Sequence, residues 1–112
     1  MKAVFHHSND DPDLHDRLVS NVGNLLDDDS IDLDAVAVVT NSGGLALVRV
    51  DSPERDRVAA LVDRGVGFKQ CHNTITGTDT DPEDLIEGVE TVPAGVGELT
   101  RLQNEGYAYL RP

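Results

Sequence analysis

AVAVV, at residues 35–39, is the strongest strand signal in the chain. Its apolar residues are continuous rather than alternating, which is typical of a strand in a parallel sheet that helices cover on both faces. Apolar or alternating runs at residues 2–5, 66–68 and 107–110 predict further strands, and a weaker run at residues 89–92 predicts a brief one. We therefore expect about five strands.

Helical patterns separate these strands. Asp11 is the expected N-cap of a first helix, which carries an apolar stripe over residues 14–25. Ser52 is the expected N-cap of a second helix, followed by a proline at its first position. Residues 45–48 fit a strand or a short helix equally well. A last helix is expected to start at Pro93 and to face the core with Val96, Leu99 and Leu102.

Strands that alternate with helices at short spacing indicate parallel βαβ units. We predict one α/β domain over residues 1–112, with a three-layer flavodoxin-like fold and a mostly parallel sheet of about five strands. In the flavodoxin-like order the first strand lies between the second and the third. The loops at His6, at residues 41–44 and at Cys71 would then share one edge of the sheet.

The composition bounds the class of protein. The 112 residues include one cysteine, so no internal disulfide is possible. The chain starts without a basic, apolar signal region, and no apolar run is long enough to cross a bilayer. We therefore expect a soluble cytoplasmic protein that does not contact a membrane.

The charge is strongly acidic, with 21 Asp and Glu against 9 Lys and Arg and a formal net charge of −12. Such a surface repels itself unless salt screens it. Because the acidic residues are spread over every segment, we interpret them as a halophilic adaptation to a high-salt cytoplasm rather than as a site for a cationic partner. The scattered basic residues disfavour nucleic-acid binding.

Cys71 is the candidate reactive group. It lies where the apolar alternation of residues 66–68 gives way to a polar loop, at the end of a strand, where α/β proteins place their ligand crevices. Lys69, a charged His72 and the backbone N–H groups at His72 and Asn73 would favour the thiolate. The alternative is an inert cysteine that fills space in the core.

Two further loops are candidates for the same pocket. The segment after residues 35–39 is polar and glycine-rich, and its glycines would let the backbone approach a ligand. It forms part of the pocket wall, an oligomer contact or an ordinary turn. The first strand is expected to end in a polar loop at His6, which would also approach Cys71. The loop residues concerned are Asn41, Ser42, Gly43 and Gly44.

Other chemistries find less support in the residues. His6, His7, Cys71 and His72 include zinc-ligand types, but no pair has an established zinc spacing, so we expect no metal and no cofactor. A Cys-His hydrolase would need an orienting acid and an oxyanion hole, and neither is marked. Tyr107 and Tyr109 are interpreted as packing residues near the surface or a subunit contact.

Three stretches together resemble the DsrE/DsrF-like family of small sulfur-relay proteins. They are GVGFKQCHNT at residues 65–74, VPAGVGEL at 92–99, and LQNEGYAY at 102–109 before the closing Pro112. The resemblance implies a flavodoxin-like α/β fold and homo-oligomers, often trimers or hexamers. In the sulfur-transferring members a cysteine accepts sulfur as a persulfide, and Cys71 is the matching position.

Two functions follow as hypotheses. The first is a sulfur carrier or sulfurtransferase in which Cys71 accepts a persulfide sulfur. Because the chain has no second cysteine, the partner must be a separate sulfur donor or acceptor protein. The second is a non-catalytic, oligomeric module that binds a small ligand or a protein, in which Cys71 is structural.

Overall fold

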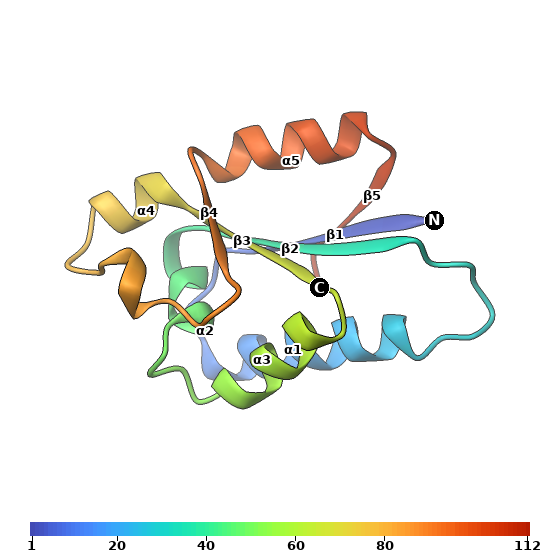
Figure 1. Ribbon diagram of the computed structural model, residues 1–112, viewed down its shortest axis with the longest axis horizontal. Coiled ribbons are helices and arrows are strands. Elements are labelled where there is room, and N and C mark those ends of the chain that lie inside the picture. The colour runs from blue at the N-terminus through green and yellow to red at the C-terminus, as the bar shows by residue number, and fades with distance from the viewer.

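The computed structural model describes residues 1–112 and contains one five-stranded, entirely parallel sheet (Figure 1). The strand order is β4-β3-β2-β1-β5. The strands are β1 (Lys2–His7), β2 (Ala35–Thr40), β3 (Gly67–Cys71), β4 (Glu90–Val92) and β5 (Tyr107–Leu110). The helices are α1 (Pro12–Leu26), α2 (Leu45–Val48), α3 (Arg55–Asp63), α4 (His72–Thr76) and α5 (Gly95–Asn104), with 3-10 turns η1 (Ser42–Gly44) and η2 (Pro82–Asp84).

Helices cover both faces of the sheet and make three layers, as predicted. Helices α1 and α3 lie on one face and α5 lies alone on the other (Figure 1). The α1 side holds a cluster of 16 buried apolar residues around Phe68, Val38 and Leu18. The α5 side holds a smaller cluster of five, in which Val4 and Val39 meet Leu99. None of the helices is both long enough and apolar enough to cross a bilayer.

The strand order corrects one expectation. The first strand was expected to lie between the second and the third, but β1 lies between β2 and β5. It is β2 that lies between β1 and β3, because β1 pairs with β2, β2 with β3 and β3 with β4. Right-handed crossovers in one direction place α1 and α3 on the same face. The connection through α5 then runs back across the sheet on the other face, and β5 pairs with β1 at the far edge. The carboxyl ends of β1, β2 and β3 still meet at one edge.

Local signals set most helix starts. The Asp11 side chain accepts the Asp13 N–H at 2.9 Å, so the predicted N-cap of α1 is confirmed. Residues 45–48 are helical. The helix predicted to start after Ser52 begins at Arg55 instead, because the Ser52 hydroxyl accepts the Glu54 N–H in a turn that precedes α3.

The start of α5 corrects a second expectation. The helix begins at Gly95 rather than Pro93, and its buried positions are Gly95, Glu98, Leu99 and Leu102. Val96 was expected to face the core but is 67% exposed. Steps of three residues fall short of a full turn, so Val96, Leu99 and Leu102 cannot all share the stripe that the spacing of 3.6 residues defines.

The surface carries the surplus of acid. Five of the seven arginines already have carboxylate partners, as in the pairs Arg64–Asp27 and Arg101–Glu98, whereas many acidic side chains have none. Raising KCl from 0.1 M toward molar concentrations should therefore raise the unfolding midpoint, since screening relieves repulsion among the unpaired carboxylates. We expect the midpoint to rise by about 4 °C or more, which corresponds to about 1 kcal/mol of added stability in a domain of this size.

Calorimetry at a series of KCl concentrations measures this dependence. A variant with Asp29→Asn, Asp79→Asn and Glu83→Gln removes three exposed charges that make no ion pair, and its midpoint should respond less to salt. A midpoint that is independent of salt in both proteins would contradict the interpretation of the charge.

Candidate functional site

Cys71 is the last residue of β3 and is 7% exposed. The residue that follows it begins α4, where the sequence predicted a loop. Gln70 is fully buried and fixes this strand end: it accepts a hydrogen bond from the Thr40 hydroxyl at 2.6 Å and donates to the Cys71 carbonyl at 3.0 Å. The position of the sulfur is therefore set by a buried link between β2 and β3.

Four groups near Cys71 can donate hydrogen bonds that favour its thiolate: the backbone N–H groups of Asn73, Thr74 and Gly95, and the Thr74 hydroxyl. Burial opposes ionisation of a thiol, because it penalises the charged form. Here the hydrogen bonds, with that from Gly95 the strongest, outweigh burial and lower the pKa of Cys71. Gly95 is the first residue of the ten-residue α5, whose helix dipole also favours a negative charge at this end.

Thr74 is held in place by the loop after β2. The Ser42 N–H donates to Thr74 Oγ1 at 3.0 Å, so the single hydroxyl proton of Thr74 is free to point at the sulfur. Ser42 has a positive φ of 48°, which non-glycine residues rarely adopt. Such backbone strain is common where a structure orients a functional group.

His6 joins the same edge through Asn41. Arg111 donates to His6 Nδ1 at 2.9 Å, and the Tyr109 hydroxyl lies 2.6 Å from the same nitrogen. A guanidinium can only donate, so Nδ1 is unprotonated and Nε2 carries the proton that is donated to Asn41 Oδ1 at 3.0 Å. Burial, together with the Arg111 charge, lowers the pKa of His6 in spite of the hydrogen bond to Asn41.

Asn41 in turn lies beside the sulfur site. A Cβ placed on Gly95 would lie 3.4 Å from the Asn41 Cβ and 3.5 Å from the Cys71 Cβ, so these two residues flank Gly95. The sheet edge therefore carries a row of groups in the order Cys71, Asn41, His6. The structure therefore brings together five of the predicted site residues: Cys71, Asn41, His6, Ser42 and Asn73.

The other predicted site residues have surroundings that differ from those expected. The Lys69 ammonium pairs with Glu90 Oε2 at 2.8 Å on the neighbouring strand, and it is not among the groups that lower the thiol pKa. The His72 side chain is exposed. A Cβ on Gly44 would lie 2.2 Å from the His7 carbonyl oxygen, and one on Gly43 would lie 2.7 Å from the Asp10 nitrogen. Because these glycines have no side chains, their backbone can lie close to the end of β1 and the loop that follows it. The sequence had instead predicted that the glycines make room for a ligand.

His6 and His7 point to opposite faces of the sheet, as neighbours in a strand do. The His7 ring lies on the α1 side, with its Nε2 at 2.7 Å from His15 Nδ1. No three His, Cys, Asp or Glu side chains come together in an arrangement that could hold a metal ion.

Sequence reasoning missed two of the groups at the sulfur. Thr74 stood in the quoted cysteine segment, but a helical turn was needed to bring its hydroxyl back to Cys71. Gly95 follows the weak fourth strand, and its proximity depends on β4 pairing with β3, with Val92 opposite Cys71. A polar residue three positions after a strand-end cysteine is the one local signal that could have indicated Thr74.

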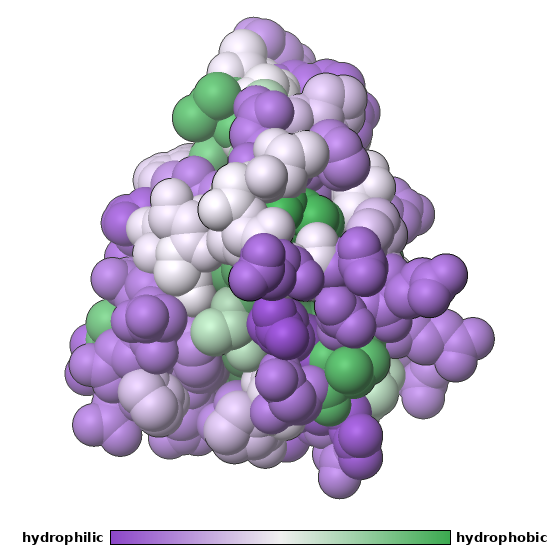
Figure 2. Space-filling model, turned by 90° about the vertical axis from the view of Figure 1, so that its left-hand side faces the viewer, coloured by the Kyte–Doolittle hydropathy of each residue, from purple (hydrophilic) through white to green (hydrophobic).

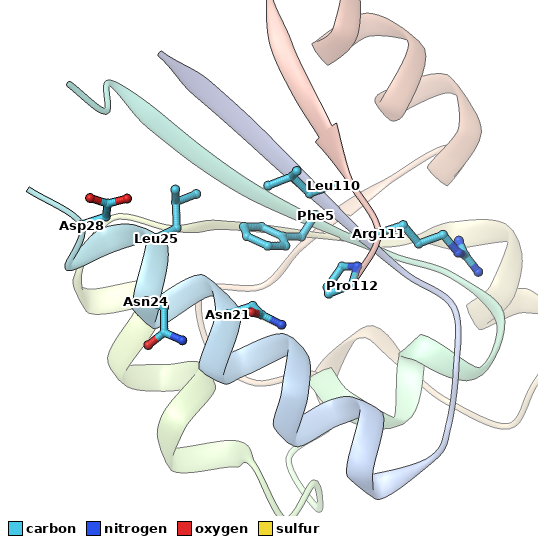
Figure 3. Close-up of a pocket in the computed structure, with 8 residues that line it drawn as sticks. All are labelled: Phe5, Asn21, Asn24, Leu25, Asp28, Leu110, Arg111 and Pro112. Carbon is cyan, nitrogen blue, oxygen red and sulfur yellow. The ribbon is translucent and has the colours of Figure 1, made fainter. Parts of the chain in front are cut away.

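The molecule also has cavities away from Cys71. One of about 420 Å³ lies between α1 and the end of β5, where Phe5, Leu25 and Leu110 provide apolar walls (Figure 3). None of the predicted site residues lines it. The end of the molecule at which α4 lies is largely hydrophilic, with only small separate hydrophobic areas (Figure 2). The sulfur site is therefore a small polar site and not a large apolar pocket.

Comparison with known proteins shows a similar fold in a solved structure. No protein-family model matches the chain, and no curated protein matches it. A solved structure of a protein of unknown function, MTH1491 from Methanobacterium thermoautotrophicum, is similar, with a TM-score of 0.93 and 40% sequence identity. The similarity covers 99% of this chain and 98% of that one, so the two share the whole fold.

Proposed function

Because this chain belongs to the same family as MTH1491 of Methanobacterium thermoautotrophicum, whose function is unknown, we propose a function from the chain's own residues. The protein is a sulfur carrier or sulfurtransferase in which Cys71 accepts a persulfide sulfur. The observation that carries the proposal is the set of four donors around one sulfur at the carboxyl edge of the sheet. The resemblance to DsrE/DsrF-like proteins supports the same chemistry.

The transfer needs only a thiolate and a place for negative charge. The Cys71 thiolate attacks the outer sulfur of a donor persulfide, R–S–SH, and forms a new S–S bond. The old S–S bond breaks, and its electron pair leaves with the donor as RS⁻. An acceptor thiolate then attacks the outer sulfur of the Cys71 persulfide and regenerates the Cys71 thiolate. No oxidant is consumed, and the donors at the sulfur stabilise the anion before and after each step.

Both partners of the reaction are separate molecules, since the chain contains a single cysteine. We propose that they are a donor and an acceptor protein in the cytoplasm, where thiols stay reduced. We also propose a homo-oligomer, trimeric or hexameric, on the basis of the family resemblance. The unpaired edge of β5, with Tyr109 and Leu110 about 40% exposed, is available for such a contact.

Intact mass spectrometry tests the proposal. The native protein is incubated with a small-molecule sulfane sulfur donor, with and without a reductant. We expect a gain of one sulfur mass that the reductant removes, because a persulfide is reducible whereas sulfinic acid is not. A protein that gains no reducible sulfur would overturn the carrier function.

The low exposure of Cys71 favours one alternative, a non-catalytic binding module in which the cysteine is structural. The two functions differ in how the thiol reacts with an alkylating reagent. A carrier should be alkylated in the folded state, at a rate that rises with pH around a depressed pKa. A structural cysteine should resist alkylation until the protein unfolds.

Thr74→Val should raise the thiol pKa and slow alkylation at neutral pH. The change removes the hydroxyl that donates to the sulfur but keeps the Thr74 N–H. A hydrogen bond to a charged group contributes about 1.5–3 kcal/mol, so the pKa should rise by about one unit or somewhat more. Thr91→Val is the matched control, because Thr91 is exposed on β4 and makes no contact with the sulfur. Equal alkylation profiles for the two variants would show that the hydroxyl has no influence.

A further inference from the structure

The strand β5 leaves one edge of the sheet open. It is an outermost strand that pairs only with β1, so the backbone N–H and C=O groups on its outer side have no strand to pair with. Natural proteins protect such edges with charged residues, prolines or bulges. The outer strand at the opposite edge, β4, is three residues long and carries Glu90, whereas β5 is the uncharged run YAYL, has no proline and pairs with β1 without a bulge. Of the two edges, β5 is therefore the better able to accept another strand.

The two faces of β5 differ in character. Tyr107 packs on the α5-side cluster and the Tyr109 hydroxyl meets His6, so both tyrosines point to the α5 side. Because side chains alternate along a strand, Ala108 and Leu110 point to the α1 side. There Leu110 forms a wall of the cavity of about 420 Å³, which lies between this side chain and α1 (Figure 3). A strand added to this edge would have aromatic neighbours on one face and an apolar cavity on the other.

Cations lie at both ends of the aromatic face. Of the nine Lys and Arg side chains, only Lys2, Arg17 and Arg111 have no carboxylate partner. The Lys2 ammonium lies 5.5 Å from the centre of the Tyr107 ring and donates to the Glu105 carbonyl at 3.2 Å, just before β5 begins. Arg111 follows the last residue of β5, and its guanidinium donates to an imidazole and a hydroxyl. Two of the three unpaired cations therefore flank one short strand.

We propose that β5 binds an extended, acidic segment of a partner protein, which adds one strand to the sheet. Tyr107 and Arg111 are four residues apart, about 13 Å along a strand. Two acidic side chains four residues apart in the added strand would therefore face Lys2 and Arg111 on the α5 side. The positions between them that point to the α1 side lie beside Ala108 and Leu110, where apolar side chains fit against the cavity. The segment is thus acidic, apolar, any, apolar, acidic, a pattern that reads alike in the parallel and the antiparallel direction.

Main-chain hydrogen bonds hold such a strand, and the charges select it. Elsewhere on this protein the net charge of −12 repels an acidic peptide and attracts a basic one. A preference for the acidic peptide at β5 would therefore belong to this edge alone. The edge does not include Cys71, so Cys71→Ser should bind the segment as the parent protein does. A failed sulfur-transfer experiment would leave this proposal standing, and the reverse also holds.

Nuclear magnetic resonance of the full ¹⁵N-labelled protein tests the edge. The probe is the capped acidic peptide Thr-Glu-Val-Thr-Leu-Glu-Thr, titrated at constant ionic strength. We expect saturable shifts of the β5 amides, and slower hydrogen exchange of those amides because their outer N–H groups become paired. Affinity should be about millimolar, since ordering a short flexible peptide offsets much of the gain from its contacts.

Two further peptides are matched controls. In the first, lysine replaces both glutamates, which reverses the charge and keeps the apolar positions. In the second, the valine and the central threonine are N-methylated. Neighbouring residues of a strand direct their N–H groups to opposite edges, so this peptide loses a ladder hydrogen bond whichever edge faces β5. Both controls should bind β5 more weakly than the acidic peptide.

Variants identify the contacts. Lys2→Gln and Arg111→Gln should each weaken binding of the acidic peptide about threefold, the size expected for an exposed ion pair. Arg17→Gln removes the third unpaired cation, which lies on α1 and does not line the cavity, and should leave the affinity unchanged. Leu110→Thr should weaken binding, because it removes an apolar wall but keeps a residue that favours strands.

Four results would overturn the proposal. β5 resonances that move with none of the peptides would show that the edge binds no such segment. Equal shifts with the lysine peptide would show that the cations play no part. Equal affinity for the N-methylated peptide would mean that the peptide does not pair with the strand. Slow exchange of the β5 amides in the free protein, together with the mass of an oligomer, would show that a second copy of the chain covers this edge.

Discussion

Cys71→Ser is expected to take up no sulfur from a sulfane sulfur donor, while the parent protein gains one reducible sulfur. The loss should be complete, because the chain has no other thiol that could form a persulfide. The fold should survive, since a serine hydroxyl can accept hydrogen bonds from the Asn73, Thr74 and Gly95 N–H groups that surround the sulfur. We expect a cost in stability of about 1 kcal/mol or less.

Mass spectrometry and denaturant unfolding of the same preparations measure both quantities. Sulfur uptake by the variant would mean that the added sulfur is not on Cys71. A variant that no longer folds would instead support a structural cysteine, the alternative considered above. Thr91→Val, with its intact thiol, serves as the loading control.

The second large effect concerns acid. Folding should lose about 3 kcal/mol of stability between pH 6.5 and pH 4 through the buried histidine His7. Burial, followed by the nearby charges of His15, Arg111 and His6, lowers the pKa of His7 from 6.5 to about 4. The unfolded chain therefore binds a proton before the folded protein does, and acid favours unfolding in this window.

Above pH 6.5 His7 is neutral in both states, so its contribution to stability is fully retained there. As the pH falls toward 4, the unfolded state alone becomes charged and the contribution is lost. Denaturant unfolding at half-unit steps of pH measures the slope. His7→Gln should flatten it, whereas His72→Gln, which removes an exposed histidine, should leave it as it is. Equal slopes in all three proteins would contradict a role for His7.

The layers and the strands could be predicted from the sequence because their signals are local. The apolar run at residues 35–39 became a central strand, and Asp11 became an N-cap through a hydrogen bond that spans two residues. The order of the strands could not be predicted in this way. Whether β2 or β1 occupies the middle depends on which strands pair, and no single segment carries that information.

The candidate site shows the same division. Cys71 at a strand end followed from the alternation of apolar residues, and a donor at Asn73 was expected. A donor at Gly95 was not expected, because its N–H group lies near the sulfur only as a result of the pairing of β4 with β3. The contact of His7 with His15 likewise depends on how α1 is set against the sheet, which the apolar stripe of the helix alone does not fix.

The pairing of β5 with β1 links the two ends of the chain and gives the sheet one outer strand that can detach by itself. Of the four side chains of β5, only Tyr107 packs against a buried cluster, and those of Ala108, Tyr109 and Leu110 are exposed, so opening this strand uncovers less buried surface than opening a central strand would. Local opening of this kind has a lower free energy than global unfolding. It would also remove Tyr109 and Arg111 from His6, and so free the His6–Asn41 pair beside the thiol. Amide hydrogen exchange in β5 should thus be faster than in β2, and it would report on the same fluctuation that loosens the edge of the sulfur site.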